Sequence, residues 1–118
     1  MYGGSVSIGR SSYIGPYTVI YGHGDVDIGN NVLIANHSTI VSSSHHYKSR
    51  SSSICHQGES LGLITIEDDV WIGSGARILA GIKVGRGSVI GANSVITKST
   101  SNYSVSGGVP AKVISFRS

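Results

Sequence analysis

A bulky aliphatic residue recurs every six positions along most of the chain. A first run begins at Ile8, a second begins at Ile28 after a slip of two residues, and a third begins at Ile66 after a longer break. The twelve positions that obey the period are Ile8, Ile14, Ile20, Ile28, Ile34, Ile40, Ile66, Ile72, Ile78, Val84, Ile90 and Ile96. A fixed period of this kind indicates a repeat architecture.

The sixfold period favours short strands over helices. Six is a multiple of the strand period of two, so one apolar side chain per hexad faces inward, whereas a helix of about 3.6 residues per turn would spread it around every face. Glycine often follows the aliphatic, as at Gly15, Gly73 and Gly91, which suits a corner that needs either a positive φ or a close backbone approach. The pattern predicts an all-β solenoid whose stacked coils bury columns of aliphatic side chains.

Length and composition narrow the class of protein. A chain of 118 residues predicts a single domain over residues 1–118. The single cysteine, Cys55, excludes a disulfide framework and a cysteine-based zinc site. No apolar run approaches the roughly 20 residues that span a bilayer, and the first ten residues lack the layout of a signal peptide. We therefore expect a soluble, cytoplasmic protein that does not bind membranes.

Charge is distributed unevenly along the chain, although the net charge is only +3. All six acidic residues lie at or before Asp69, and the basic residues that follow it are Arg77, Lys83, Arg86, Lys98, Lys112 and Arg117. This asymmetry suggests a polyanionic partner for the C-terminal half, or else a solvated surface that keeps the protein soluble. Because the basic residues are scattered singly, without interleaved aromatics, we do not expect nucleic acid to be that partner.

The hexads IGRSSY, IGPYTV, IGSGAR, VGRGSV and IGANSV resemble those of the hexapeptide-repeat transferases. The resemblance implies a left-handed parallel β-helix of triangular section with three hexads per coil, usually assembled as a homotrimer. Its hand is an exception to the right-handed crossover rule, so the spacing alone does not predict it. Twelve hexads then imply about four coils, with residues 45–63 as an extruded loop and residues 100–118 as a short C-terminal cap.

The longer break, from about His45 to Leu63, is polar and opens with two adjacent histidines. Loops often carry function, and histidine exchanges protons near neutral pH. The stretch GNNVLIANHSTIVSSSHHY resembles the maltose and galactoside O-acetyltransferase branch and the similar acetyltransferases of polysaccharide biosynthesis. That resemblance assigns the catalytic histidine to His45, with His46 as the alternative. The two-residue slip between Ile20 and Ile28 predicts only a bulged corner, without catalytic weight.

A second resemblance to the same family lies in the segments VWIG, VIGANSVITK and GVPAKVI. In the family, coenzyme A lies along the prism at a subunit interface. Carried over position by position, the resemblance implies coenzyme contacts from Trp71, Ser74, Ala92, Thr97, Lys98 and Lys112. The two lysines, with Arg117, would then pair with the coenzyme phosphates, which gives the charge asymmetry a physical use. Ser74 and Ala92 would act through their backbone N–H groups.

Together these features predict an acetyl-CoA-dependent O-acetyltransferase that acts on a sugar or sugar-containing acceptor. His45 would take the proton from an acceptor hydroxyl, whose oxygen would attack the thioester directly. A backbone N–H of Ser74 or Gly75 would hold the oxyanion. No metal is expected, and we interpret Cys55 as incidental because nothing recognisable would activate its thiol.

Two other functions fit the same fold. A non-catalytic β-helix that serves as a binding or structural module predicts no change in melting temperature with coenzyme A. A metal enzyme like the γ-class carbonic anhydrases needs three histidine ligands, but the five histidines of this chain do not reproduce that family's spacing.

The chain also departs from the galactoside branch. An acceptor-positioning asparagine of that branch falls near Gly15, and a second basic residue near the end falls at Ser115. The repeat begins within the first ten residues, without the upstream helical region of some members, so we expect a minimal version of the family or a fragment.

Overall fold

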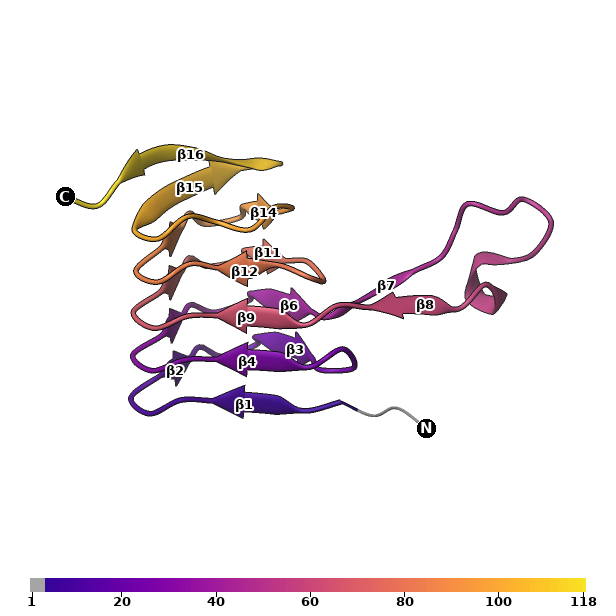
Figure 1. Ribbon diagram of the computed structural model, residues 1–118, viewed down its shortest axis with the longest axis horizontal. Helices are drawn as coiled ribbons and strands as arrows, with labels where there is room; N and C mark the ends of the chain where they lie inside the picture. Colours follow the sequence, from indigo (N-terminus) through magenta and orange to yellow (C-terminus); the bar gives the residue numbers. More distant parts are fainter. Residues whose placement is uncertain (1–3) are drawn as a thin grey trace.

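The computed structural model describes residues 4–118, which form short strands wound into a three-sided prism (Figure 1). The first two coils hold β1 (Val6–Ile8), β2 (Tyr13–Ile14), β3 (Val19–Tyr21), β4 (Val26–Ile28), β5 (Leu33–Ile34) and β6 (Thr39–Val41). The next two coils hold β9 (Ile64–Ile66), β10 (Trp71–Ile72), β11 (Arg77–Ile78), β12 (Lys83–Val84), β13 (Val89–Ile90) and β14 (Val95–Ile96). The predicted all-β prism of about four triangular coils is therefore confirmed.

Three sheets form the faces of the prism. Face A has the strand order β1-β4-β9-β12 and face C the order β3-β6-β11-β14. Face B contains β2-β5-β10-β13 and continues into the two C-terminal strands, β15 (Ser104–Gly108) and β16 (Ala111–Phe116). In the regular coils Trp71 pairs with Val89, 18 residues further along the chain. Three hexads therefore close one coil, as the resemblance implied.

The hexad aliphatics fill the inside of the prism. In register, Ile72 lies between Ile34 of the coil below and Ile90 of the coil above, and all three are at most 1% exposed. Buried serine hydroxyls join the coils at the corners: the Ser38 hydroxyl donates to the Gly73 carbonyl of the next coil, at 3.1 Å. Because each coil buries its aliphatics only against its neighbours, stacking supplies the stability of the fold.

The glycines that follow many of the hexad aliphatics allow the backbones of neighbouring coils to approach closely. A Cβ added at Gly73 would lie 2.7 Å from the backbone nitrogen of Ala92 in the next coil, a distance that real Cβ atoms essentially never show. The positive φ angles of the corners fall two residues later, as at His37 (62°), Gly75 (72°) and Asn93 (59°). Of the two reasons that the sequence left open for these glycines, close approach is the one that applies.

The polar break leaves the prism as an antiparallel ribbon at the corner between faces C and A. β7 (Ser43–His45) pairs with β8 (Glu59–Leu61), and a short 3-10 turn, η1 (Ile54–His56), lies between them. Figure 1 shows the ribbon projecting sideways from the middle of the stack. The predicted extruded loop is confirmed, although it begins at Ser43, two residues earlier than expected.

The C-terminal residues cap the far end of the stack. β15 runs parallel to β13, and β16 turns back antiparallel along β15 to form the outer edge of face B. Figure 1 shows this pair lying across the end of the prism opposite β1. None of the helical segments in residues 4–118 is long and apolar enough to cross a membrane.

Candidate active site

Hydrogen bonds attach the root of the ribbon to the segment of the coil beneath it that contains the two-residue slip. Ser42 is fully buried at the root of the ribbon. Its hydroxyl donates to the Tyr21 carbonyl at 2.7 Å and accepts from the Gly24 N–H at 2.8 Å. Where the ribbon returns, the Gly62 N–H donates to the Ser42 carbonyl at 2.8 Å. Residues 21–25 and Ser42, which we call the ribbon anchor, therefore determine where β7 and β8 leave the prism.

His45 ends β7 and borders a pocket of about 500 Å³ at the root of the ribbon, which we call the root pocket. The pocket is lined by Tyr21, His23, Val41, Ser43, His45, Cys55, Gly58 and Glu59. Glu59 lies directly opposite His45 in the ribbon register, and its Oε1 lies 3.5 Å from the Nδ1 of His23. The fold thus gathers two imidazoles and one carboxylate around the predicted catalytic position.

His46 belongs to the other side of the ribbon. Successive side chains of an extended strand point to opposite faces. His46 lines a separate pocket of about 330 Å³ with Lys48 and Gln57, and its backbone N–H donates to the Gly58 carbonyl at 3.0 Å. His45 borders both pockets, but only His45 shares the root pocket with Glu59. This geometry favours His45 over His46.

Three of the predicted coenzyme residues lie on face B or at its corner with face C. Trp71 is 51% exposed on the outer surface of face B, between Leu33 and Val89. Ser74 and Ala92 occupy consecutive coils at the corner between faces B and C. The Ser74 hydroxyl donates to the Oδ1 of Asn36 in the coil below, at 2.7 Å. Because the Ser74 side chain is engaged in this contact, a coenzyme contact by Ser74 would come from its backbone.

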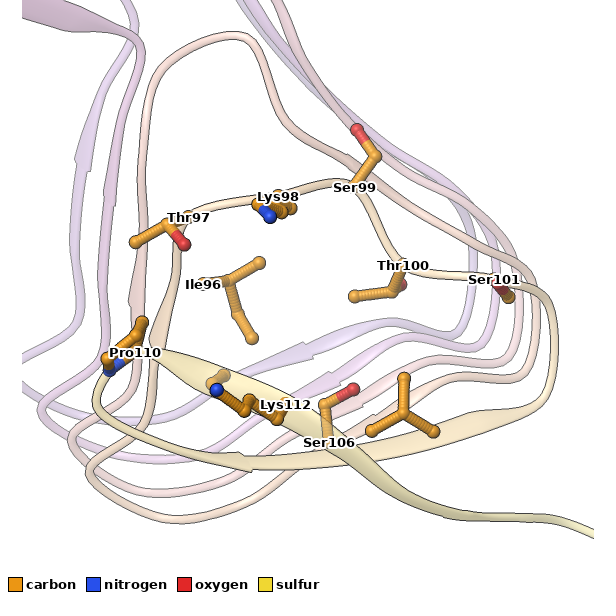
Figure 2. Close-up of a pocket in the computed structure, with 11 residues that line it drawn as sticks. Ile96, Thr97, Lys98, Ser99, Thr100, Ser101, Ser106, Pro110 and Lys112 are labelled. Atoms are coloured by element: carbon orange, nitrogen blue, oxygen red, sulfur yellow. The ribbon is translucent and has the colours of Figure 1, made fainter.

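The other three, Thr97, Lys98 and Lys112, border a pocket of about 370 Å³ at the C-terminal end of the prism (Figure 2). Figure 2 shows the two lysine side chains on opposite sides of Ile96, and both lysines are exposed. Arg117 does not join them: its guanidinium lies 3.1 Å from the Asp69 carboxylate. Two of the candidate cations thus border one pocket at the end of the prism, and the third is paired with Asp69.

The hydrogen bonding of the structure distinguishes between the two candidate oxyanion donors, the backbone N–H groups of Ser74 and Gly75. The Gly75 N–H donates to the Asn36 carbonyl at 3.1 Å, so Gly75 is a poor donor to an oxyanion. Within one chain, moreover, the ribbon that carries His45 leaves the prism at the corner between faces C and A, whereas Ser74 lies at the corner between faces B and C. A single copy therefore does not bring the predicted catalytic histidine and the predicted coenzyme corner together.

Tyr21, His23 and Glu59 line the pocket beside His45, although the sequence analysis did not select them as candidate site residues. A signal for the first two was present, because the slip and the loop interrupt the period at the same point of consecutive coils. In the register Tyr21 pairs with Val41, so the slip follows β3 as the ribbon follows β6. The pairing of Glu59 with His45 had no comparable signal in the sequence, since the connection between them lacks a period.

Comparisons with known proteins find relatives with the same repeat and the same fold. Residues 64–98 match the family described as bacterial transferase hexapeptide (six repeats). The chain is 40% identical over 116 residues to galactoside O-acetyltransferase from Escherichia coli (strain K12), which covers 96% of this chain and 55% of that protein. The chain spans about half the length of this relative and of a Schizosaccharomyces pombe acetyltransferase that it also matches.

Solved structures share the fold. A hexapeptide-repeat-containing acetyltransferase from Vibrio cholerae has a TM-score of 0.87 at 31% identity, covering 96% of this chain and 64% of that one. Its complex with acetyl coenzyme A has a TM-score of 0.86 at 29% identity, with 96% and 61% covered. The polySia-specific acetyltransferase NeuO has a TM-score of 0.78 at 32% identity, with 94% and 51% covered. The shared fold is the left-handed parallel β-helix, which confirms the predicted hand. Residues 64–98 carry the family's hexapeptide repeat, and over nearly its whole length the chain is similar in sequence and fold to hexapeptide-repeat acetyltransferases, galactoside O-acetyltransferase among them.

Proposed function

We propose that this chain is the catalytic prism of an acetyl-CoA-dependent O-acetyltransferase that acts on a hydroxyl of a sugar or sugar-containing acceptor. The observation that carries the proposal is the position of His45, which shares the root pocket with Glu59 and His23. The relatives support the substrates, since one is a galactoside O-acetyltransferase, one is solved with acetyl coenzyme A and one is specific for polySia.

In the proposed reaction His45 acts as the general base. Its imidazole accepts the proton of the acceptor hydroxyl while the acceptor oxygen forms a bond to the thioester carbonyl carbon. The carbon–sulfur bond then breaks, and the coenzyme A thiolate takes the proton from the imidazolium. The backbone N–H of Ser74 is the donor that we assign to the oxyanion, because the Gly75 N–H already donates to Asn36. Lys98 and Lys112 would attract the coenzyme phosphates.

We further propose that the enzyme is a homotrimer in which the ribbon of one copy faces the B/C corner of the next. The outward residues of face A are polar, namely Ser7, Asp27, Thr65 and Lys83. Those of face B are apolar, namely Tyr13, Leu33, Trp71, Val89 and Val105. An apolar surface of this kind favours contact with another molecule. A neighbouring copy would also supply the coenzyme corner that His45 does not reach within its own chain.

The test is a product screen by mass spectrometry, with acetyl-CoA and a panel of sugars and nucleotide sugars. The wild-type protein should add an acetyl group to at least one acceptor. His45→Ala should lower kcat by about a hundred- to ten-thousand-fold with an unchanged circular dichroism spectrum, because general-base catalysis is worth about that much. His46→Ala tests the alternative base, and His56→Ala is a matched control because His56 lies outside the root pocket.

Two results would contradict the proposal. A His45→Ala variant that keeps more than about a third of the wild-type kcat would exclude His45 as the base. If no acceptor gains an acetyl group and coenzyme A leaves the melting temperature unchanged, the acetyltransferase function itself is wrong and the non-catalytic alternative stands.

A further inference from the structure

The root pocket holds a second histidine that the proposed mechanism does not use. His23 comes from the two-residue slip, and its side chain and that of Glu59 are only 26% and 27% exposed. The other ion pairs of residues 4–118, Lys83 with Glu67 and Arg117 with Asp69, are more exposed on both sides. Since solvent screens a partly buried contact less than an exposed one, protonated His23 would attract Glu59 more strongly than the exposed lysine and arginine attract their carboxylates.

The other residues of the ribbon anchor restrain His23 on the side away from Glu59. The Tyr21 ring meets the His23 ring edge-on, with centroids 6.4 Å apart and planes at 64°. The backbone on either side of His23 is also held, because the Gly24 N–H donates to the Ser42 hydroxyl and the Asp25 N–H donates to the Gly22 carbonyl at 2.9 Å. The imidazole of His23 is therefore presented to Glu59 by a well-restrained segment.

Glu59 in turn faces His45. Residues directly opposite each other in an antiparallel pair have Cβ atoms about 4.5–5.5 Å apart on the same side of the ribbon. Glu59 and His45 are such a pair, and both line the root pocket. A carboxylate that reaches the imidazole from this position would stabilise the imidazolium that forms when His45 accepts a proton. The remaining titratable groups that line the pocket are the phenol of Tyr21 and the thiol of Cys55.

We propose that His23 is a positioning residue, which holds the Glu59 carboxylate across from His45 so that Glu59 stabilises the imidazolium during acetyl transfer. The inference rests on the proposed function, because it takes His45 as the general base. In this arrangement His23 exchanges no proton with the acceptor. In this proposal the two-residue slip contributes to catalysis, because it places His23 of one coil beside Glu59 in the return strand, β8, of the ribbon above it.

The kinetic test compares His23→Ala, His23→Gln, Glu59→Gln and the double variant His23→Ala/Glu59→Gln, with His56→Ala as the matched histidine control. Glu59→Gln should lower kcat about tenfold, and His23→Ala by about three- to tenfold, while the KM for acetyl-CoA stays unchanged. His23→Gln should restore most of the lost kcat, because its amide can donate to Glu59. Since His23 acts through Glu59, the double variant should be no slower than Glu59→Gln alone.

Three kinetic results would overturn the inference. Single-variant effects that multiply in the double variant would show that His23 acts independently of Glu59. A His23→Ala variant with kcat as low as that of His45→Ala would make His23 itself a base. A His23→Ala variant with wild-type kcat would show that the contact has no catalytic role.

An NMR measurement keeps the inference testable without an acceptor. In protein labelled with nitrogen-15 at histidine, Glu59→Gln should move the imidazole resonances of both His23 and His45, whereas His56 stays in place. His23→Ala should move the His45 resonance as well. If neither variant moves His45, the positioning role is wrong even in an active enzyme. If both variants move His45 but the wild-type protein transfers no acetyl group to any acceptor, the proposed function fails and the positioning contact stands.

Discussion

Replacing Ser42 with alanine tests whether the ribbon anchor holds the ribbon, and with it His45, in place. The buried hydroxyl accepts the Gly24 N–H at 2.8 Å and donates to the Tyr21 carbonyl at 2.7 Å. Alanine removes both contacts. The Tyr21 carbonyl keeps the backbone N–H of Ser42 as a donor at 3.1 Å, but the Gly24 N–H loses its acceptor.

The size of the effect follows from the unsatisfied donor. A buried polar group that loses its only partner costs about 1–3 kcal/mol. The cost applies to the closed ribbon, because an opened ribbon exposes the Gly24 N–H to water. Since about 1.4 kcal/mol corresponds to a factor of ten, the fraction of molecules with an open ribbon should rise about five- to 150-fold.

Native-state amide hydrogen exchange measures this opening directly. The reporter is the Gly62 amide, which donates to the Ser42 carbonyl where the ribbon returns to the prism. Ser38→Ala is the matched control, because Ser38 is equally buried but its hydroxyl donates to the Ala35 and Gly73 carbonyls at the B/C corner. We expect faster exchange at Gly62 in Ser42→Ala and not in Ser38→Ala. Exchange at Gly62 within about twofold of wild type, or equal acceleration in both variants, would refute the reasoning.

Three further predictions concern the coenzyme and the corners of the prism. Lys98→Ala and Lys112→Ala should each raise the KM for acetyl-CoA up to about fivefold at low salt and less at high salt, because exposed charge pairs are worth about 0.2–1 kcal/mol. Lys48→Ala should leave this KM unchanged. Steady-state kinetics at two salt concentrations measures the difference. Gly73→Ala should lower the free energy of unfolding by about 1–3 kcal/mol in denaturant titrations, since its Cβ would lie 2.7 Å from the Ala92 nitrogen; an unchanged midpoint would contradict the close approach. Coenzyme A at about a hundred times its Kd should stabilise the wild-type protein by about 2.7 kcal/mol in thermal melts. A melting temperature that is the same with and without coenzyme A would argue against binding.

The hexad period predicted the architecture because every coil repeats one physical requirement. An aliphatic such as Ile72 must face the aliphatics of the coils below and above, and the register places Ile34 and Ile90 there. The closure of a coil by three hexads and the left hand were available only through the family resemblance, since a period of six is compatible with other ways of closing a coil. The corner glycines illustrate the same limit, because the sequence did not distinguish close approach from positive φ.

The candidate site was less predictable because its residues come from segments that no period relates. His45 was predicted from the family resemblance of the stretch that ends the regular hexads. Its neighbours Glu59 and His23 come from the return strand of the ribbon and from the coil below. Their meeting depends on the ribbon register and on the hydrogen bonds of Ser42, which are tertiary features. Similarly, Arg117 looked available for a phosphate, but the fold places it beside Asp69.

The most direct test of the account is complementation between two inactive variants, because the central claim is that His45 of one copy faces the coenzyme corner of its neighbour. His45→Ala removes the base, and Ala92→Phe blocks the corner without touching the ribbon; sedimentation should show that both remain trimeric. In trimers formed from a one-to-one mixture, about a quarter of the sites combine an intact His45 with an intact neighbouring corner. The account predicts about a quarter of the wild-type kcat in the mixture. A mixture as inactive as its components, with mixed trimers present, would contradict it.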